Sequence, residues 1–280
     1  MRQTIAMKAA RFARTIALSS AIALCGAVTA KADALEEVME RGTIRFGTEM
    51  QYPPFDMIVD GEYQGVSRDV AEGIAAHLGV KAEYTDLPWS SVLPGLEAGR
   101  FDVVNAPVTI TAERVQRYAF TIPFATGTVG LVKRADDDRI AQPEDIAGLV
   151  IGGQTASSQL DQLHDYVGTL DGGAELREYV DMNQAYSDLL AGRIDAAVGP
   201  LLNLAYLTQS RTEFATVEPA FGTPTYFSMA LRLEEDSDSL RAAVDEAIAA
   251  MHESGEMERI QKKWFGTTID LPTEVPEPLI

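Results

Sequence analysis

This sequence of 280 residues has one cysteine and three histidines, and it lacks the motifs of metal and nucleotide enzymes. The single cysteine, Cys25, leaves no second thiol for an internal disulfide. The three histidines have none of the spacings that bind a metal; they are His77, His164 and His252. The sequence also has no glycine-rich phosphate loop and no nucleophile elbow. These absences argue against a metalloenzyme or a nucleotide-dependent enzyme, and no cofactor or metal is expected.

Basic residues are few after the first 32 positions, where 18 Lys and Arg side chains stand against 42 Asp and Glu side chains, a net charge of −24. A chain of this charge is repelled by a phosphate backbone, so no nucleic-acid partner is expected. The acidity fits a solvated surface and does not by itself indicate a function.

Long apolar runs are confined to the N-terminus, where four basic residues precede the apolar stretch Ile16–Val28 and a series of small residues. This order is typical of a secretory signal peptide, and the apolar stretch is too short for a dependable membrane span. Small residues favour cleavage after Ala32 over the alternative after Ala30. We therefore expect residues 1–32 to be a signal peptide, and the rest to be a soluble protein of two compact units.

Strand and helix patterns alternate along the remaining chain. Residues 43–47 alternate as a half-buried strand does, and apolar residues recur at every fourth position from Val70 to Leu78, before Gly79. The series continues with a helix, a strand, a short helix and a strand over 91–98, 101–105, the residues after Thr111 and 128–133. This alternation predicts an α/β sandwich with a mostly parallel sheet.

One segment occurs twice, 93 residues apart. Residues 96–103 (LEAGRFDV) match residues 189–196 (LLAGRIDA), and each copy has the pattern of a helix end, a glycine cap and a buried strand. Two similarly built lobes are predicted, the alternative being a chance likeness of two common helix–strand junctions. At this offset Pro107 aligns with Pro200, just past the expected carboxyl end of each strand, where open α/β sheets bind ligands.

Arg114 has the surroundings of a carboxylate receptor. It follows Thr111, a predicted helix N-cap, and Glu113, which suits a first helical turn. Free N–H groups at a helix start, the Thr109 hydroxyl and a planar guanidinium together match the two oxygens of a carboxylate. Taken alone, the pattern also fits a surface arginine on a short helix.

Two further pairs of residues are candidates for ligand contact. Ser157 and Ser158 open the helix predicted after the strand at 149–151, and offer a second set of donors to the same anion. Tyr52 and Trp89 lie near predicted strand ends, where their rings can pack on an apolar or cationic part of a ligand. Taken alone, the serines also fit ordinary helix capping, and Trp89 also fits the core.

Together these residues resemble the family 3 solute-binding proteins of polar amino-acid ABC importers, over about residues 43–266. The resemblance rests on the order and spacing of short motifs: Gly47-Thr48-Glu49, Tyr52-Pro53-Pro54-Phe55, Gly65 with Asp69, 89–94, Phe101-Asp102, 109–114, 120–124 and Lys263-Trp264-Phe265-Gly266. No single motif is decisive, but their combination is highly specific.

The resemblance implies a type II periplasmic binding protein, in which two α/β lobes are joined by two crossover strands and hold a ligand in the cleft between them. Lobe 1 would comprise residues 33–125 and 228–280, and lobe 2 residues 126–227. The resemblance also implies a set of ligand-binding residues. These are Arg114 and Thr109 at the ligand carboxylate, Ser157 and Ser158 completing that site from lobe 2, Tyr52 and Trp89 beside the ligand body, Glu49 at its distal end, and the Pro107 carbonyl at an α-ammonium.

Two positions depart from the family pattern. The lobe 2 aspartate that pairs with the α-ammonium falls at Pro200, and the first aspartate of the glycine-aromatic-aspartate motif falls at Ser67. Burying an ammonium without a carboxylate costs roughly several kcal/mol. Either Glu49 or another acid replaces the missing partner, or the ligand has no free primary α-amine. The second alternative is favoured here, with cyclic or N-substituted amino acids and other organic acids as candidates.

The sequence thus predicts a periplasmic, monomeric solute-binding protein without enzymatic activity. Its expected partners are a small carboxylate-bearing ligand, an amino acid or a derivative, and the membrane permease of an ABC importer. The alternative is a periplasmic enzyme on the same scaffold that resembles cyclohexadienyl dehydratase. Such an enzyme needs a proton donor, for which a buried carboxyl with a raised pKa would serve. Pro200 removes one position for that group, and Glu49 remains.

Overall fold

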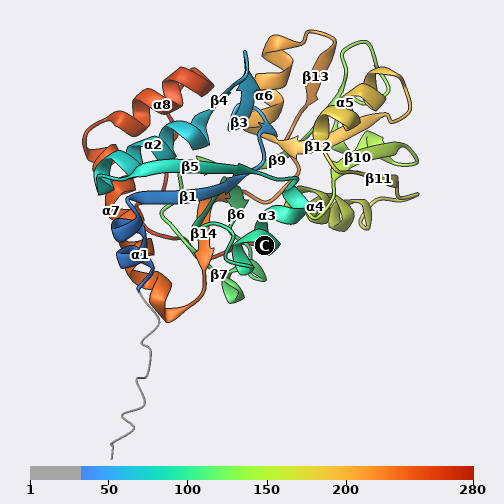
Figure 1. The fold of residues 1–280 in the computed structure, drawn as a ribbon. Helices are drawn as coiled ribbons and strands as arrows, with labels where there is room; N and C mark the ends of the chain where they lie inside the picture. The colour runs from blue at the N-terminus through green and yellow to red at the C-terminus, as the bar shows by residue number, and fades with distance from the viewer. Residues whose placement is uncertain (1–32) are drawn as a thin grey trace, which may run out of the picture. The chain divides into compact units, whose positions relative to one another are not determined.

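A computed structural model of the chain describes residues 33–280, which form three β-sheets with helices packed around two of them (Figure 1). The predicted signal peptide, residues 1–32, lies outside the described residues. No helix within residues 33–280 is both long and apolar enough to cross a membrane.

The first sheet has the strand order β5-β1-β6-β14-β7, with β8 paired to β14. Its strands are β1 (Thr43–Thr48), β5 (Lys81–Asp86), β6 (Val103–Thr109), β7 (Tyr118–Phe120), β8 (Ala125–Thr126) and β14 (Tyr226–Arg232). Strand β1 is parallel to β5 and β6, whereas β14 is antiparallel to β6, β7 and β8. Every residue of β6 is buried, as expected for a central strand that is covered on both faces.

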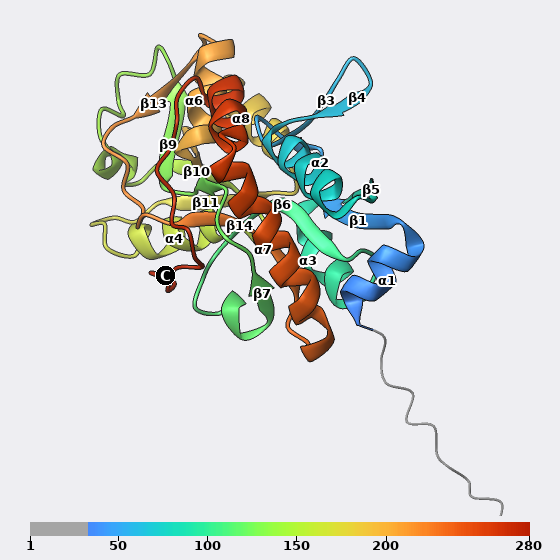
Figure 2. The same cartoon turned by 90° about the vertical axis from the view of Figure 1, so that its left-hand side faces the viewer.

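Helices cover both faces of this sheet. They are α1 (Ala34–Arg41), α2 (Val66–Leu78), α3 (Trp89–Glu97), α7 (Asp238–Glu253) and α8 (Glu256–Phe265), with 3-10 turns η1 (Arg114–Gln116) and η3 (Glu235–Ser237). Helices α1, α2, α7 and α8 share one apolar core with the sheet, and α3 contributes to a second core (Figure 2). Helix α2 ends where the sequence predicts, because Gly79 adopts the left-handed conformation (φ 69°) that closes a helix. A small sheet of β2 (Gln51–Tyr52), β3 (Asp56–Val59) and β4 (Glu62–Gln64) completes this part of the chain.

The second large sheet repeats this strand pattern in the order β11-β10-β12-β9-β13. Its elements are β9 (Val129–Arg134), β10 (Val150–Gln154), β11 (Glu175–Tyr179), β12 (Ala196–Pro200), β13 (Phe214–Val217), η2 (Pro143–Ile146), α4 (Ser158–Val167), α5 (Met182–Leu190) and α6 (Leu201–Ser210). Strand β10 is parallel to β11 and β12, and β9 is antiparallel to β12 and β13. Both large sheets are therefore mixed, not mostly parallel as predicted, because strands distant in sequence join them in the opposite direction.

The repeated sequence segment takes equivalent places in the two sheets. One copy joins α3 to β6, and the other joins α5 to β12. The Asp102 carboxylate accepts from the N–H of Arg45 in β1 (2.8 Å), and the Asp195 carboxylate accepts from the N–H of Val150 in β10 (3.0 Å). Arginine side chains also bind both carboxylates. Each aspartate thus ties its helix–strand junction to the first strand of its sheet, which gives the repeat a structural cause.

The two large sheets are connected where the chain crosses between them in two neighbouring segments. The first crossing lies between β8 and β9, and the second between β13 and β14. Thr126 pairs with Tyr226 beside both crossings. The predicted lobe boundaries, at 125/126 and 227/228, stay predictions at the level of single residues.

Two predictions about the start of helices differ from the structure. Helix α3 begins at Trp89, not at 91, and the helix has no side-chain cap at its start. Pro88, extended at φ −56° and ψ 142°, occupies the N-cap position of this helix. The helix expected after Thr111 is only the 3-10 turn η1.

Pro107 lies inside β6 and not beyond its end. The pairing of β6 with β14 is irregular between Ser228 and Ala230, opposite this part of β6. A proline has no N–H to donate to a strand ladder, so an irregular pairing accommodates it. Pro200, its counterpart, is the last residue of β12.

Candidate functional site

The predicted site residues surround a small cavity between elements of the two large sheets. Its volume is about 10 Å³, and its lining residues are Glu49, Tyr52, Trp89, Ala106, Pro107, Thr109, Arg114, Gln154, Ser157 and Gln159. Seven of the eight predicted residues are in this set. The eighth, Ser158, contacts the set by donating a hydrogen bond from Oγ to Thr109 Oγ1 (2.7 Å). The structure therefore brings all eight together around one cavity.

Arg114 is partly buried and held by backbone carbonyls on both sides of the cavity. Its Nη1 donates to the Thr109 carbonyl (3.3 Å) and its Nη2 donates to the Ala156 carbonyl (3.4 Å). Its guanidinium lies over the Trp89 ring, with Cζ 5.4 Å from the ring centre. Burial lowers the pKa of Arg114, but a guanidinium stays protonated in proteins. Within residues 33–280 it forms no ion pair, so this cation in the cavity wall suits an anionic ligand group.

The start of helix α4 supplies polar groups opposite Arg114. Ser157 is the N-cap, as predicted, and its Oγ accepts from the N–H of Leu160 (3.1 Å). Gln159, on the first turn, is directed to Thr109 with Nε2 3.4 Å from Oγ1. The positive end of the helix dipole adds to the attraction for an anion here.

Ala156 joins the start of α4 to the other side of the cavity. Its φ of 60° lies in the left-handed region, which costs a non-glycine residue roughly 1–2 kcal/mol. In this conformation its carbonyl accepts from Trp89 Nε1 (2.9 Å) and from Arg114 Nη2 (3.4 Å). The strained turn therefore fixes two site residues, which sequence patterns did not predict.

Glu49 follows strand β1 and places a carboxyl group in the same cavity. Only 5% of the residue is exposed, and its Oε1 accepts from Gln154 Nε2 (2.7 Å). Burial raises the pKa of Glu49 from 4.5 to about 7, against the opposing effect of the Gln154 hydrogen bond. Glu49 and Arg114 thus place a buried carboxyl group and a partly buried guanidinium on one cavity.

A second buried acid, Asp56, lies near Glu49 and was not predicted. It has no exposed surface, and the hydroxyls of Thr48, Tyr63 and Ser67 donate to its carboxylate. Burial raises its pKa to about 7, although these hydrogen bonds act in the opposite direction. Ser67, where the family pattern has an aspartate, therefore supports a carboxylate carried by β3 instead.

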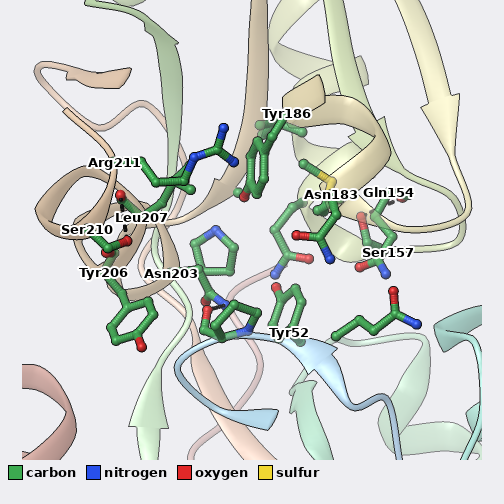
Figure 3. A pocket seen from close by; sticks show the side chains of 17 residues that line it. Tyr52, Gln154, Ser157, Asn183, Tyr186, Asn203, Tyr206, Leu207, Ser210 and Arg211 are labelled. Carbon is green, nitrogen blue, oxygen red and sulfur yellow. Dashed lines mark hydrogen bonds between the residues drawn. The ribbon is translucent and has the colours of Figure 1, made fainter. Parts of the chain in front are cut away.

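A larger cavity of about 140 Å³ adjoins the first (Figure 3). Tyr52, Gln154, Ser157 and Gln159 line both. The other residues of the larger cavity are Gln51, Pro53, Met182, Asn183, Tyr186, Val198, Gly199, Pro200, Asn203, Tyr206, Leu207, Ser210 and Arg211. Of these only Pro53 and Pro200 were singled out from the sequence. Most of the others lie on α5 and α6, whose apolar spacing resembles ordinary core packing.

Hydrogen bonds cross between the two sides of the site. They run from Trp89 Nε1 to the Ala156 carbonyl, from Ser158 Oγ to Thr109 Oγ1, from Gln154 Nε2 to Glu49 Oε1 and from Asn203 Nδ2 to the Pro53 carbonyl (2.8 Å). The two sides of the site are therefore in direct contact in this structure. Within residues 33–280, no cluster of His, Cys, Asp and Glu side chains is arranged to hold a metal ion.

Comparisons with known proteins identify the family of the chain. Residues 44–267 match the model of the bacterial extracellular solute-binding proteins, family 3. The L-cystine-binding protein TcyJ of Escherichia coli K12 is 32% identical over 256 residues, which cover 89% of this chain and 94% of TcyJ. The L-cystine-binding protein TcyA of Bacillus subtilis 168 is 29% identical over 94% of this chain and 99% of TcyA.

Solved structures of amino-acid-binding proteins match the fold of this chain. An ancestral arginine-binding protein bound to arginine matches with a TM-score of 0.74 at 30% identity, over 81% of this chain and 99% of that one. The ancestral amino acid-binding protein AncCDT-1, a precursor of cyclohexadienyl dehydratase, matches with a TM-score of 0.75 at 28% identity, over 82% and 99%. These matches confirm the predicted type II periplasmic binding-protein fold with two α/β lobes. Because the family model spans most of its length, the chain belongs to the bacterial extracellular solute-binding proteins, family 3.

Proposed function

We propose that this chain binds an amino acid between its two lobes and delivers it to the permease of an ABC importer. The observation that carries the proposal is that a partly buried Arg114 and a buried Glu49 line one cavity. An amino acid presents a carboxylate and an ammonium a few ångströms apart, and these two side chains complement that pair of charges. The relatives TcyJ and TcyA are named as L-cystine-binding proteins, so L-cystine is the first ligand to test.

In the proposed complex the ligand carboxylate binds Arg114, with Thr109, Ser157 and Ser158 as hydrogen-bond donors. The ammonium binds Glu49 and the Pro107 carbonyl. Gln154 supports this placement, because its amide nitrogen already donates to Glu49 (2.7 Å) as an ammonium would. We therefore propose that Glu49 replaces the aspartate missing at position 200. The sequence alone had favoured the other alternative, a ligand without a primary amine.

Ligand entry requires movement in this proposal. A volume of about 10 Å³ holds roughly one water molecule, far less than an amino acid. Tyr52 and Trp89 would flank the ligand from lobe 1, while Gln154 and Gln159 would have to move off the groups that they now contact. We infer that the lobes, divided near 125/126 and 227/228, separate to admit the ligand and close on it.

The test is titration calorimetry with L-cystine, L-arginine, L-histidine and L-glutamine. Arg114→Ala should weaken binding of the preferred ligand by roughly 30-fold or more, because losing one partner of a buried charge pair costs about 2 to 5 kcal/mol. Arg117→Ala is the matched control, since Arg117 is exposed and pairs with Glu97. An Arg114→Ala protein that is folded and binds with unchanged affinity would contradict the carboxylate assignment.

An enzyme of the dehydratase type is the second candidate. Two observations favour it: Glu49 is a buried carboxyl with a pKa of about 7, and one structural match is the precursor of cyclohexadienyl dehydratase. The family match and the relatives named as binding proteins favour binding without turnover. We expect incubation with prephenate or arogenate to give no aromatic product, and formation of one would make the enzyme the better proposal.

Location and assembly belong to the same proposal. The signal-like segment before residue 33 and the extracellular family both support export to the periplasm. The chain is proposed to act as a monomer that meets its permease with ligand bound. Secretion of a tagged protein and its elution volume in size-exclusion chromatography test these two points.

A further inference from the structure

The larger cavity contains polar groups that the amino-acid head does not need. Tyr186 lies on α5 and is 9% exposed, and its hydroxyl makes no hydrogen bond to any residue in 33–280. The Asn203 Oδ1 atom is also buried without a hydrogen-bond partner in this part of the chain, while its Nδ2 is fixed on the Pro53 carbonyl (2.8 Å). A buried acceptor such as Asn203 Oδ1 is expected to have a partner, and a bound ligand can supply one. The Tyr186 hydroxyl borders the same cavity and is free to bind the same ligand.

Arg211 brings a positive charge to the same cavity. Its guanidinium lies 4.5 Å from the centre of the Phe214 ring, and the Tyr186 ring packs on Phe214 at 5.8 Å between centres. Phe214 therefore holds the guanidinium and the Tyr186 phenol close together, and Figure 3 shows the two side chains next to each other at one side of the cavity. The guanidinium nitrogen that is engaged, Nε, donates to Glu213 (3.0 Å).

The charge of the cavity lining selects the kind of group that it attracts. No Asp or Glu is among the lining residues, and Arg211 is the single charged one, although the protein as a whole is strongly acidic. An arginine and a free phenol hydroxyl together match the two oxygens of a carboxylate. Because this cavity shares Tyr52 and Gln154 with the cavity at Arg114, one ligand can occupy both.

We infer that Tyr186 and Arg211 form a distal subsite for a second carboxylate, so that the preferred ligands are elongated amino acids with a carboxylate at each end. Asn203 Oδ1 accepts from an N–H group when the far end also carries an amine. This inference rests on the proposed function, since the α-amino-acid head must occupy the site at Arg114. The length of the ligand and its second carboxylate then decide which amino acids bind.

Two matched ligand pairs test the subsite by calorimetry. The first pair is L-cystine and the mixed disulfide of L-cysteine with cysteamine, which keeps both amines and lacks only the second carboxylate. The second pair, free of sulfur, is L-2-aminopimelate and L-2-aminoheptanoate. In each pair the dicarboxylate should bind about 10-fold or more tightly, since a hydrogen bond to a charged group is among the stronger ones.

Variants then locate the effect. Tyr186→Phe and Arg211→Gln should each reduce the affinity ratio within a pair by about 10-fold. Arg177→Gln is the matched control, because Arg177 is similarly exposed and pairs with Glu175, two residues away, as Arg211 pairs with Glu213. This control should keep the wild-type ratio.

The outcomes separate the subsite from the proposed function. A ratio near one in the wild-type protein, or a ratio unaffected by both variants, would overturn the distal subsite while amino-acid binding stands. If other amino acids bind and neither member of either pair does, the subsite also fails. If no amino acid binds at all, the proposed function fails, and the subsite fails with it.

Discussion

Binding of an amino acid should expel a proton from Glu49. In the structure the pKa of this carboxyl is raised from 4.5 to about 7 because it is buried. A ligand ammonium placed against it would favour the ionised form and lower its pKa in the complex. Proton release by Glu49 therefore reports whether the ligand carries an ammonium and where that ammonium lies.

The magnitude follows from the pKa of about 7. At pH 7 about half of the unliganded molecules carry the proton, so about half a proton should be released for each ligand bound. Release should approach about one proton at pH 6 and about a tenth at pH 8. The association constant should accordingly rise about tenfold from pH 6 to pH 8, because binding and deprotonation are linked.

Calorimetry in buffers of different ionisation enthalpy measures this number directly, since the slope of the observed enthalpy gives the protons released. Glu49→Gln should abolish the release and flatten the pH dependence. Asp56→Asn is the necessary control, because Asp56 is a second buried carboxyl whose pKa is about 7. Binding without proton release between pH 6 and 8, or release that survives in Glu49→Gln, would refute the placement of the ammonium.

The same pKa predicts an effect on stability with the opposite slope. Because the folded-state pKa of Glu49 exceeds its ordinary value of 4.5, the folded protein holds more protons than the unfolded chain between pH 4.5 and about 7. The contribution of Glu49 to stability is therefore lost as the pH rises through this window, by roughly 3 kcal/mol at about 1.4 kcal/mol per unit. Glu49→Gln should raise the unfolding free energy of the unliganded protein at pH 8 and leave it nearly unchanged at pH 4.

The helix–strand junction at Asp102 and the closure of the two lobes can be tested in the same protein. Asp102→Ala should lower the unfolding free energy by about 2 to 4 kcal/mol in urea titrations, because it removes a buried acceptor of a backbone N–H and of two arginines. The control is Asp171→Ala, since Asp171 is exposed. Equal effects of the two substitutions would contradict the proposed role of the repeat. Saturating ligand should reduce the radius of gyration in small-angle scattering as the lobes close about 124–128 and 227–230, and an unchanged radius would indicate a rigid site.

Much of the fold was predictable because its signals are local. The helix end at Gly79 and the cap at Ser157 follow from the residues that terminate helices, and the structure has both. The repeat was visible because Asp102 and Asp195 serve the same junction in each sheet. The direction of β14 was not predictable in this way, since it joins β6 from more than a hundred residues away and makes the first sheet mixed.

Most of the predicted site lies on the side that carries the family motifs, and on the other side the sequence indicated only Ser157 and Ser158. Arg114 and Thr109 came from such a motif, and the structure places them in one cavity. Tyr186 lies on α5 among residues spaced like a buried helix face, so its sequence pattern indicates core packing. Gln154 had a usable signal, because it is the last residue of a parallel strand, the position where ligand contacts gather in α/β sheets. Nothing in the local sequence distinguishes Asp56 from an ordinary surface aspartate.

The departures at Pro200 and Ser67 have a common interpretation once the structure is considered. Ser67 donates to Asp56, and Glu49 lies nearby, so the negative charge missing from the family positions is found on the lobe 1 side. If Glu49 binds the ammonium, then Arg114, Thr109 and Glu49 can hold both charged groups of an amino acid before lobe 2 closes. Lobe 2 then contributes Tyr186 and Arg211, which contact only the far end of the ligand. In this arrangement lobe 1 recognises any amino acid, and closure selects among them, because only a ligand long enough to reach the second cavity stabilises the closed form.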